Sequence, residues 1–143
     1  TGPGLLAALE AGPDIVKIGR IEAVESGVVS EDATAVEAAV GLVERGARLA
    51  VATDGAQEVA AADASTVWRM SVPPIEALNP VGSGDSFNAA LSLALMDGAD
   101  VPTALARGVA AGSANALTKS AASLDPEVAA ALEDDVTVTT IER

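Results

Sequence analysis

The sequence has no cysteine and no histidine. These absences exclude disulfide bonds, thiolate nucleophiles, histidine-based zinc sites and an imidazole general base. Aromatic residues are also scarce, with one Trp, one Phe and no Tyr among the 143 residues. A chain of this length forms about one domain. Its core must therefore rest on Val, Leu, Ile and Ala.

Basic residues are few as well. The chain has 8 Lys plus Arg against 21 Asp plus Glu, which gives a formal net charge of −13. A negative field of this size repels nucleic-acid backbones and anionic membranes, so we expect neither as a partner. If the ligand is an anion, local dipoles and a few well-placed cations must hold it.

Apolar runs long enough to cross a membrane are missing too, because charged residues interrupt each run before the ~18 residues that a span needs. The sequence shows no signal-peptide pattern and opens at Thr1 without an initiator Met. These features predict a cytoplasmic protein whose true N-terminus lies upstream of Thr1.

Short buried strands alternate with helical segments along the chain. Extended segments are predicted at residues 14–18, 48–53, 58–63, 65–72 and 136–141. Helices are predicted at residues 31–45, 85–96, 102–118 and 126–132, with a further short one that ends at Gly12. This alternation is typical of an α/β fold with a mainly parallel sheet flanked by helices.

One motif carries a chemical signal, namely Gly82-Ser83-Gly84-Asp85 directly before a predicted helix. Glycines let the backbone turn its N–H groups inward, and the start of a helix adds about half a positive charge. Together these features make an anion site that needs no Lys or Arg. A carboxylate beside such a site can accept a proton from an attacking hydroxyl, which is the pairing that phosphoryl transfer needs.

The same motif has an ordinary interpretation. A carboxylate in the first turn of a helix is common capping. Short Gly-x-Gly-Asp sequences also occur in many loops without a catalytic role. The motif by itself leaves both interpretations open.

A longer stretch decides between them by resemblance. "NPVGSGDSFNAALSLAL" closely resembles the signature of the PfkB/ribokinase-like carbohydrate kinases, and its first seven residues are most similar to the tagatose-6-phosphate kinase and 1-phosphofructokinase branch. Three more stretches resemble family motifs in the family's order, namely "PDIVKIGRIEA", "VATDGAQEV" and "GVAAGSANAL". The resemblance spans nearly all 143 residues. It covers only the C-terminal half of the family's fold, which implies that the lid and the N-terminal strands are absent.

The resemblance implies a role for each matching position. Asp85 would be the catalytic base, and the amides of Gly82, Ser83 and Gly84 would form the anion hole. Glu22 would help to organise Mg²⁺, through water because Mg²⁺ dehydrates reluctantly. The positions implied to contact ATP are Lys17, Thr53 and Gly55 at the phosphates or ribose, Ala114, Asn115 and Thr118 at the adenine, and Val81.

These positions also have structural interpretations. Lys17 and Glu22 can be a solvated pair at a strand end. The segment 53–55 can be a plain turn. Asn115 can face solvent or a neighbouring helix.

The sequence departs from the family pattern in three places. Gly19 stands where the family has Asn, which removes a side-chain contact to metal or phosphate. Glu58 replaces the second Gly of the nucleotide turn, so it is expected to bring bulk and negative charge near the triphosphate. The segment 118–125, "TKSAASLD", lacks the Gly that follows the adenine-side helix.

The function implied is ATP-dependent phosphoryl transfer to a hydroxyl of a sugar phosphate, carried out by a longer parent protein. We expect no sugar phosphorylation from the 143 residues alone. The expected macromolecular partner is a second copy of the chain or the missing N-terminal half. The alternative hypothesis is a non-catalytic nucleotide-binding or interaction module, which Gly19 and Glu58 favour. A Rossmann-type dinucleotide site is disfavoured, because no Gly-x-Gly-x-x-Gly follows a first strand.

Overall fold

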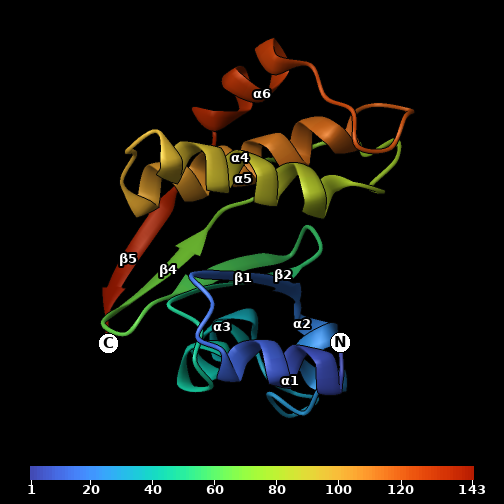
Figure 1. Cartoon of the computed structure of the whole chain (residues 1–143). Coiled ribbons are helices and arrows are strands. Elements are labelled where there is room, and N and C mark those ends of the chain that lie inside the picture. Colours follow the sequence, from blue (N-terminus) through green and yellow to red (C-terminus); the bar gives the residue numbers. More distant parts are fainter. The chain divides into compact units, whose positions relative to one another are not determined.

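The computed structural model describes all residues, Thr1–Arg143, and they divide into two units. The first unit is Thr1–Arg69 with Thr139–Arg143, and the second is Met70–Val138. The first contains α1 (Pro3–Glu10), β1 (Ile15–Gly19), α2 (Arg20–Glu25), α3 (Ala35–Glu44), β2 (Leu49–Asp54) and β3 (Glu58–Ala62) (Figure 1). The second contains α4 (Ser83–Met96), α5 (Val101–Ala116) and α6 (Pro126–Glu133). Two strands, β4 (Thr66–Met70) and β5 (Val138–Glu142), overlap the division by one residue each.

The sheet has the strand order β1-β2-β3-β4-β5. Strand β1 pairs with β2 in parallel, whereas β2 pairs with β3 antiparallel. At the other edge, the Ser71 N–H donates to Thr137 O and the Arg143 N–H donates to Ser65 O, so β5 runs antiparallel to β4.

The sheet is therefore mixed, and the expectation of a mainly parallel sheet was wrong. The reason lies in the lengths of the connections. A parallel pair needs a long crossover, and the chain between β1 and β2 provides one with α2 and α3. Only residues 55–57 join β2 to β3, which is long enough for a hairpin alone.

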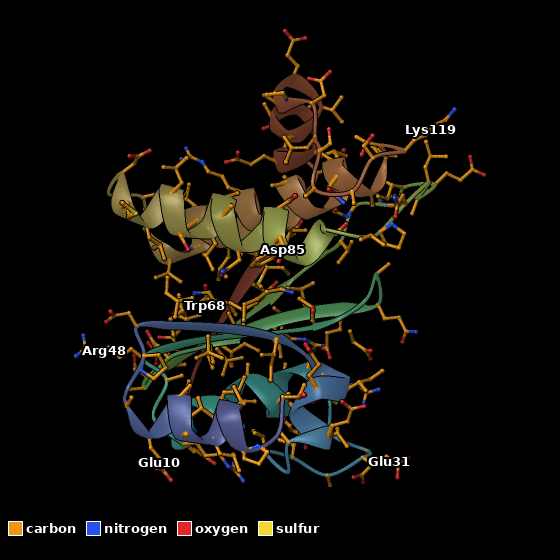
Figure 2. The ribbon with its side chains drawn as sticks, turned by 45° about the vertical axis from the view of Figure 1, so that its right-hand side comes forward. Glu10, Glu31, Arg48, Trp68, Asp85 and Lys119 are labelled. Atoms are coloured by element: carbon orange, nitrogen blue, oxygen red, sulfur yellow. The ribbon has the colours of Figure 1, made fainter.

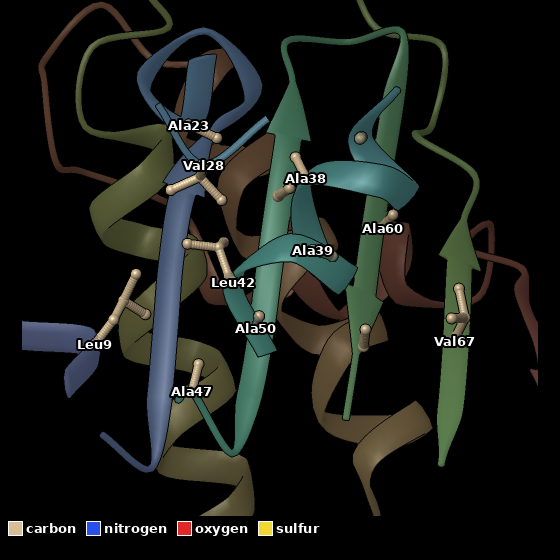
Figure 3. Packing of buried hydrophobic residues seen from close by; sticks show 13 residues of the cluster. Leu9, Ala23, Val28, Ala38, Ala39, Leu42, Ala47, Ala50, Ala60 and Val67 are labelled. Carbon is tan, nitrogen blue, oxygen red and sulfur yellow. The ribbon is translucent and has the colours of Figure 1, made fainter. Parts of the chain in front are cut away.

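Alanine, one of the four residue types expected in the core, dominates the core of the first unit. One face of the sheet packs against α3 through side chains that are all completely buried (Figure 3). These side chains are Ala50 and Ala52 of β2, Ala60 and Ala62 of β3, and Ala35, Ala38, Ala39 and Leu42 of α3. Because successive side chains of a strand alternate between faces, Val51 and Thr53 belong to the opposite face.

The second unit consists of helices, and α5 contacts both α4 and α6. Glycines allow the close approach of α4 to α5. A Cβ at Gly108 would lie 3.0 Å from the ring of Phe87, and a Cβ at Gly112 would lie 3.0 Å from the backbone oxygen of Ser83. Helix α5 therefore packs directly against the first turn of α4.

Most predicted elements are confirmed within a few residues, with two exceptions. Helix α3 begins at Ala35 rather than at residue 31, because Thr34 and Glu37 form a capping box there. Helix α2 was not predicted, since it has six residues and depends on a capping contact rather than on an apolar face. No helix is long and apolar enough to cross a bilayer.

Candidate functional site

Residues 79–85, which we call the glycine loop, lead into α4. Gly82 precedes the helix with a left-handed φ of 87°, and no side chain caps the helix start. The Ser83 N–H, one of the three amides predicted for the anion hole, is not open, because it donates to Pro80 O at 3.1 Å within a turn. The N–H groups of Gly82, Gly84 and Asp85 have no protein acceptor. Three backbone donors are thus open at the start of a helix of 14 residues.

This geometry suits a negatively charged group. Open N–H groups and the positive end of the helix dipole both attract anions, such as phosphoryl oxygens. Asp85 lies in the first turn of α4, and its side chain is exposed (Figure 2). A carboxylate and a set of open amides are therefore adjacent on one helix start.

A turn formed by the Asn79 side chain holds the beginning of the glycine loop. Asn79 Oδ1 accepts a hydrogen bond from the Val81 N–H at 3.0 Å, and Asn79 Nδ2 donates to Lys119 O at 3.0 Å. The backbone N–H groups of Leu78 and Asn79 both donate to Ala116 O, at the end of α5. The loop is thereby fastened to the C-terminal end of α5.

Asn115 fastens the other side of the loop. Its side chain is completely buried. Nδ2 donates to Val81 O at 3.0 Å and to Ser83 Oγ at 3.1 Å, and Oδ1 accepts from the Ser123 N–H at 3.0 Å. Asn115 therefore contacts a helix neighbour, as one of its two predicted interpretations has it.

The other two predicted adenine contacts are also engaged within the protein. Ala114 is buried. The Thr118 hydroxyl lies 2.7–3.0 Å from three backbone oxygens, those of Asn115, Ser120 and Ser123. Contact of Ala114, Asn115 and Thr118 with adenine stays a prediction.

The segment after α5 packs on the glycine loop, and one of its residues, Ala122, adopts a backbone conformation typical of glycine. Ala122 has a φ of 51°, the left-handed region that glycine favours. Its N–H donates to Val81 O at 3.4 Å. A Cβ on Gly82 would overlap the backbone nitrogen of Ala122. The family pattern has Gly in this segment, and the chain keeps a glycine-like turn there with alanine.

In the first unit, Lys17 and Thr53 lie on the same face of the sheet. Val16 and Ile18 pack against the core that α3 covers, so Lys17 between them belongs to the opposite face. Lys17 pairs with Val51 in the parallel register, and Thr53 lies two residues further along β2. Gly55 follows in a turn with a φ of 56° and has open space around its Cβ position.

Glu58 turns away from that face. Its Oε2 accepts a hydrogen bond from the Ala35 N–H at 3.1 Å, at the start of α3. Its Oε1 forms an ion pair with Arg69 at 2.7 Å. The carboxylate thus lies on the α3 side of the sheet with its charge paired, whereas Thr53 belongs to the other side. The expectation that Glu58 places negative charge near the triphosphate therefore does not follow from this arrangement.

An open hollow of about 590 Å³ surrounds the Glu58 pair, also within the first unit. A second ion pair, Arg20 Nε to Asp54 Oδ2 at 3.0 Å, lies in its wall. Arg20 also donates to the backbone oxygens of Glu31 and Ala33. The arginines of this hollow therefore hold protein acceptors from the ends of β2, β3 and the loop before α3.

Glu22 performs a structural task in α2. Its Oε2 accepts a hydrogen bond from the Gly19 N–H at 2.7 Å, which closes the capping box of that short helix. No group of three or more acidic side chains converges anywhere in the chain. Mg²⁺ often binds through one or two carboxylates and substrate phosphates, so a single glutamate fits it only together with a nucleotide.

The predicted site residues fall into two sets. Those in the first unit are Lys17, Glu22, Thr53 and Gly55, and those in the second are Val81, Gly82, Ser83, Gly84, Asp85, Ala114, Asn115 and Thr118. Sequence reasoning gave no role to Asn79, the first residue of the quoted motif, and missed the contacts of Asn115 with the glycine loop. Two signals were present, because Asn before Pro favours a turn and a single Asn in an alanine-rich helix needs a partner when buried.

Open helix starts of this kind occur in α/β proteins that bind phosphate groups through backbone amides. The chain belongs to the pfkB family of carbohydrate kinases. The sequence pattern described as "pfkB family carbohydrate kinase" matches residues 2–128. No curated protein sequence matches the chain.

Solved structures agree with this family. Phosphofructokinase-2 from Escherichia coli in complex with potassium is 28% identical with a TM-score of 0.84, and the match covers 94% of this chain and 45% of that chain. The tetrameric inhibited form of the same enzyme is 30% identical with a TM-score of 0.76, covering 92% and 44%. Ribokinase from Thermotoga maritima is 22% identical with a TM-score of 0.73, covering 85% and 42%. The chain thus spans less than half the length of these proteins.

Proposed function

We propose that this chain supplies the phosphoryl-transfer part of a sugar-phosphate kinase. The reaction moves the γ-phosphoryl group of ATP to a hydroxyl of a hexose phosphate, such as tagatose 6-phosphate or a fructose phosphate. The family relationship supports the sugar-kinase class. The residues Asn79–Asp85 favour the tagatose-6-phosphate kinase and 1-phosphofructokinase branch, by resemblance.

The observation that carries the proposal is the open start of α4. The N–H groups of Gly82, Gly84 and Asp85 have no partner in the protein. In phosphoryl transfer, negative charge is spread over the oxygens of the moving group, and fixed donors that need no rearrangement stabilise it. The three open amides are donors of this kind.

Asp85 acts on the acceptor. Its carboxylate orients the sugar hydroxyl and takes its proton as the new O–P bond forms. In a loose transition state the proton leaves late, so orientation contributes more than prior deprotonation. General-base assistance of this kind is worth about 10²–10⁴ in rate.

The cofactors enter through the family, whose members depend in general on ATP and Mg²⁺. Bound Mg-ATP supplies the phosphoryl group and neutralises charge on its oxygens. Lys17 and Thr53 would hold the nucleotide from one face of the sheet, and Gly55 would let its backbone approach closely. Glu22 would orient a metal-bound water through the carboxylate oxygen that does not cap α2.

Apart from Asp85, contacts to the acceptor sugar would come largely from outside these residues, since the chain corresponds to the C-terminal part of the kinase domain in this proposal. The remainder would be an N-terminal half or a second copy of the chain. The Escherichia coli relative forms a tetramer. The 143 residues alone are expected to bind nucleotide without phosphorylating sugar.

The alternative of a non-catalytic nucleotide-binding module now rests on Gly19 alone, because the Glu58 carboxylate is paired with Arg69 and the start of α3. Titration with ATP in the presence and absence of Mg²⁺ separates the two functions. A kinase requires binding that depends on the metal. Binding of equal strength in both titrations, or no binding in either, favours the module.

The direct test uses the longest chain that is encoded around these residues, with fructose 6-phosphate, fructose 1-phosphate and tagatose 6-phosphate as acceptors. Asp85→Asn should lower kcat by about 10²–10⁴ while ATP binding is retained. Asp97→Asn, at the other end of α4, is the matched control and should leave kcat unchanged. An Asp85→Asn variant with normal turnover would refute the role of Asp85.

A further inference from the structure

Asn115 is the most thoroughly bonded polar side chain in the second unit. It lies in α5 and has no exposed surface. An asparagine amide offers two donors and one oxygen with two lone pairs. Both donors are used, on Val81 O and Ser83 Oγ, and the oxygen lies 3.0 Å from the Ser123 N–H and 3.4 Å from Ser86 Oγ.

The contact with Val81 O has a particular consequence for the start of α4. Helix α4 begins at Ser83, so the Asp85 N–H is one of the first-turn donors that have no acceptor within the helix. If the helix were extended backwards through Gly82, the acceptor four residues earlier would be Val81 O. That oxygen instead accepts from Asn115 Nδ2 at 3.0 Å and from the Ala122 N–H at 3.4 Å. The Asp85 N–H is left without a protein acceptor.

We propose that Asn115 is a positioning residue for phosphoryl transfer. It holds Val81 O outside the helix, which opposes an extension of α4 through Gly82 and thereby keeps the Asp85 amide open for a phosphoryl oxygen. The role rests on the proposed function and deepens it, because Asn115 acts on the reacting group through the glycine loop.

The proposal predicts how changing Asn115 alters the hydrogen exchange of the Asp85 amide. In the wild-type protein the amides of Gly84 and Asp85 exchange quickly. When Asn115 no longer holds Val81 O, that oxygen becomes available to the Asp85 N–H, so the exchange of this amide becomes slower. A purely structural loss of Asn115 would have the opposite sign, because a loosened loop exchanges faster at all its amides.

Two variants test this statement. Asn115→Asp keeps the size of the side chain and removes both Nδ2 donors, and Asn115→Ala removes the whole amide. Asn88→Asp makes the same chemical change at an exposed asparagine of α4 and serves as the control. NMR-detected exchange is measured in the 143-residue chain for all four proteins, and kcat and KM are measured in the longest encoded chain.

We expect slower exchange at Asp85 in both Asn115 variants, and kcat lower by tenfold or more with KM for the sugar phosphate nearly unchanged. The upper bound is the roughly 10²–10³-fold loss that follows removal of one oxyanion donor. Faster exchange at Asp85, or an unchanged kcat with unchanged exchange, would overturn the role of Asn115. If neither variant folds, slow exchange of the Asp85 amide in the wild-type protein would overturn it too.

The failure of this inference is distinguishable from that of the proposed function. An inactive wild-type protein whose Asp85 amide still slows in the variants would contradict the kinase function and leave the positioning of Val81 O intact. An active wild-type protein with insensitive variants would contradict only the role of Asn115.

Discussion

The starts of α3 and α4 each have a carboxylate in the first turn, Glu37 and Asp85. The backbone N–H groups around this carboxylate are bonded to side chains at α3 and open at α4. At α3, Glu37 Oε2 accepts from the Thr34 N–H at 2.7 Å, and Thr34 Oγ accepts from the Glu37 N–H. The Ala35 N–H donates to Glu58. At α4 the first-turn carboxylate, Asp85, caps nothing, and the amides around it are open.

This difference separates a helix start that stabilises the fold from one whose donors the fold does not use. The first four N–H groups of any helix lack partners within the helix. At α3, side chains accept from the N–H groups of Thr34, Ala35 and Glu37, which stabilises the fold. At α4 no side chain caps the helix. Folding alone explains the first arrangement, and in our proposal anion binding explains the second.

The most disruptive change should be Gly82→Ala. Its Cβ would overlap the Ala122 backbone, and its left-handed φ disfavours alanine. Left-handed strain and overpacking together should lower the free energy of unfolding by about 2–5 kcal/mol and abolish anion binding. Gly55→Ala is the matched control, because Gly55 is left-handed with open space around it and should cost only about 1–2 kcal/mol. Equal losses in chemical denaturation would contradict this account of the glycine loop.

Thr34→Ala should have the next largest effect. It removes the side-chain cap of α3, so the free energy of unfolding should fall by about 0.5–2 kcal/mol. Urea denaturation measures the loss. Nucleotide binding should be unaffected, since the proposed nucleotide contacts do not include the start of α3. A change in ATP affinity without a change in stability would show that the start of α3 is not purely structural.

A smaller effect is expected from Ala122→Gly. Alanine at a φ of 51° carries strain of about 1–2 kcal/mol, and glycine relieves it. Glycine also raises the entropy of the unfolded chain, which offsets about 0.4–1 kcal/mol of that gain. The net change in the free energy of unfolding should be stabilising by about 1 kcal/mol or less. A destabilised variant would mean that the methyl group of Ala122 packs usefully against the glycine loop.

The smallest effect should be a pH dependence of the α3 start. Hydrogen bonds from the Thr34 N–H, and then from its hydroxyl, lower the pKa of Glu37 below its ordinary value of 4.5. A carboxyl with a lowered folded-state pKa stabilises the fold above its unfolded pKa, and this contribution disappears as the pH falls through the folded pKa. The melting temperature of Glu37→Gln should therefore fall less steeply than that of the wild type below about pH 4.5. If the melting temperatures of the two proteins fall in parallel with pH, carboxylates other than Glu37 cause the acid sensitivity.

Much of the local structure follows from the sequence. The scarcity of aromatic residues predicts a core of Val, Leu, Ile and Ala, and the strands and most helices follow from apolar spacing. The glycine loop also follows from local chemistry, because Gly82 and Gly84 flank the start of a regular helical pattern. The direction of strand pairing was available as well, since three residues between β2 and β3 permit only a hairpin.

Other features depend on contacts between residues far apart in the chain. Glu58 reaches the start of α3 across 23 positions, and Asn115 reaches Val81 across 34. No local pattern specifies which distant oxygen or amide a buried asparagine will meet. Sequence reasoning therefore finds the glycine loop, whereas the structure is needed to find the buried side chain that bonds to it.

The most direct measurement of the central claim is an NMR titration of the wild-type chain with inorganic phosphate. The account predicts saturable shifts of the Gly84 and Asp85 amide signals, with the capped amides of Ala35 and Glu37 unmoved. Equal shifts at both helix starts, or none at α4, would contradict it.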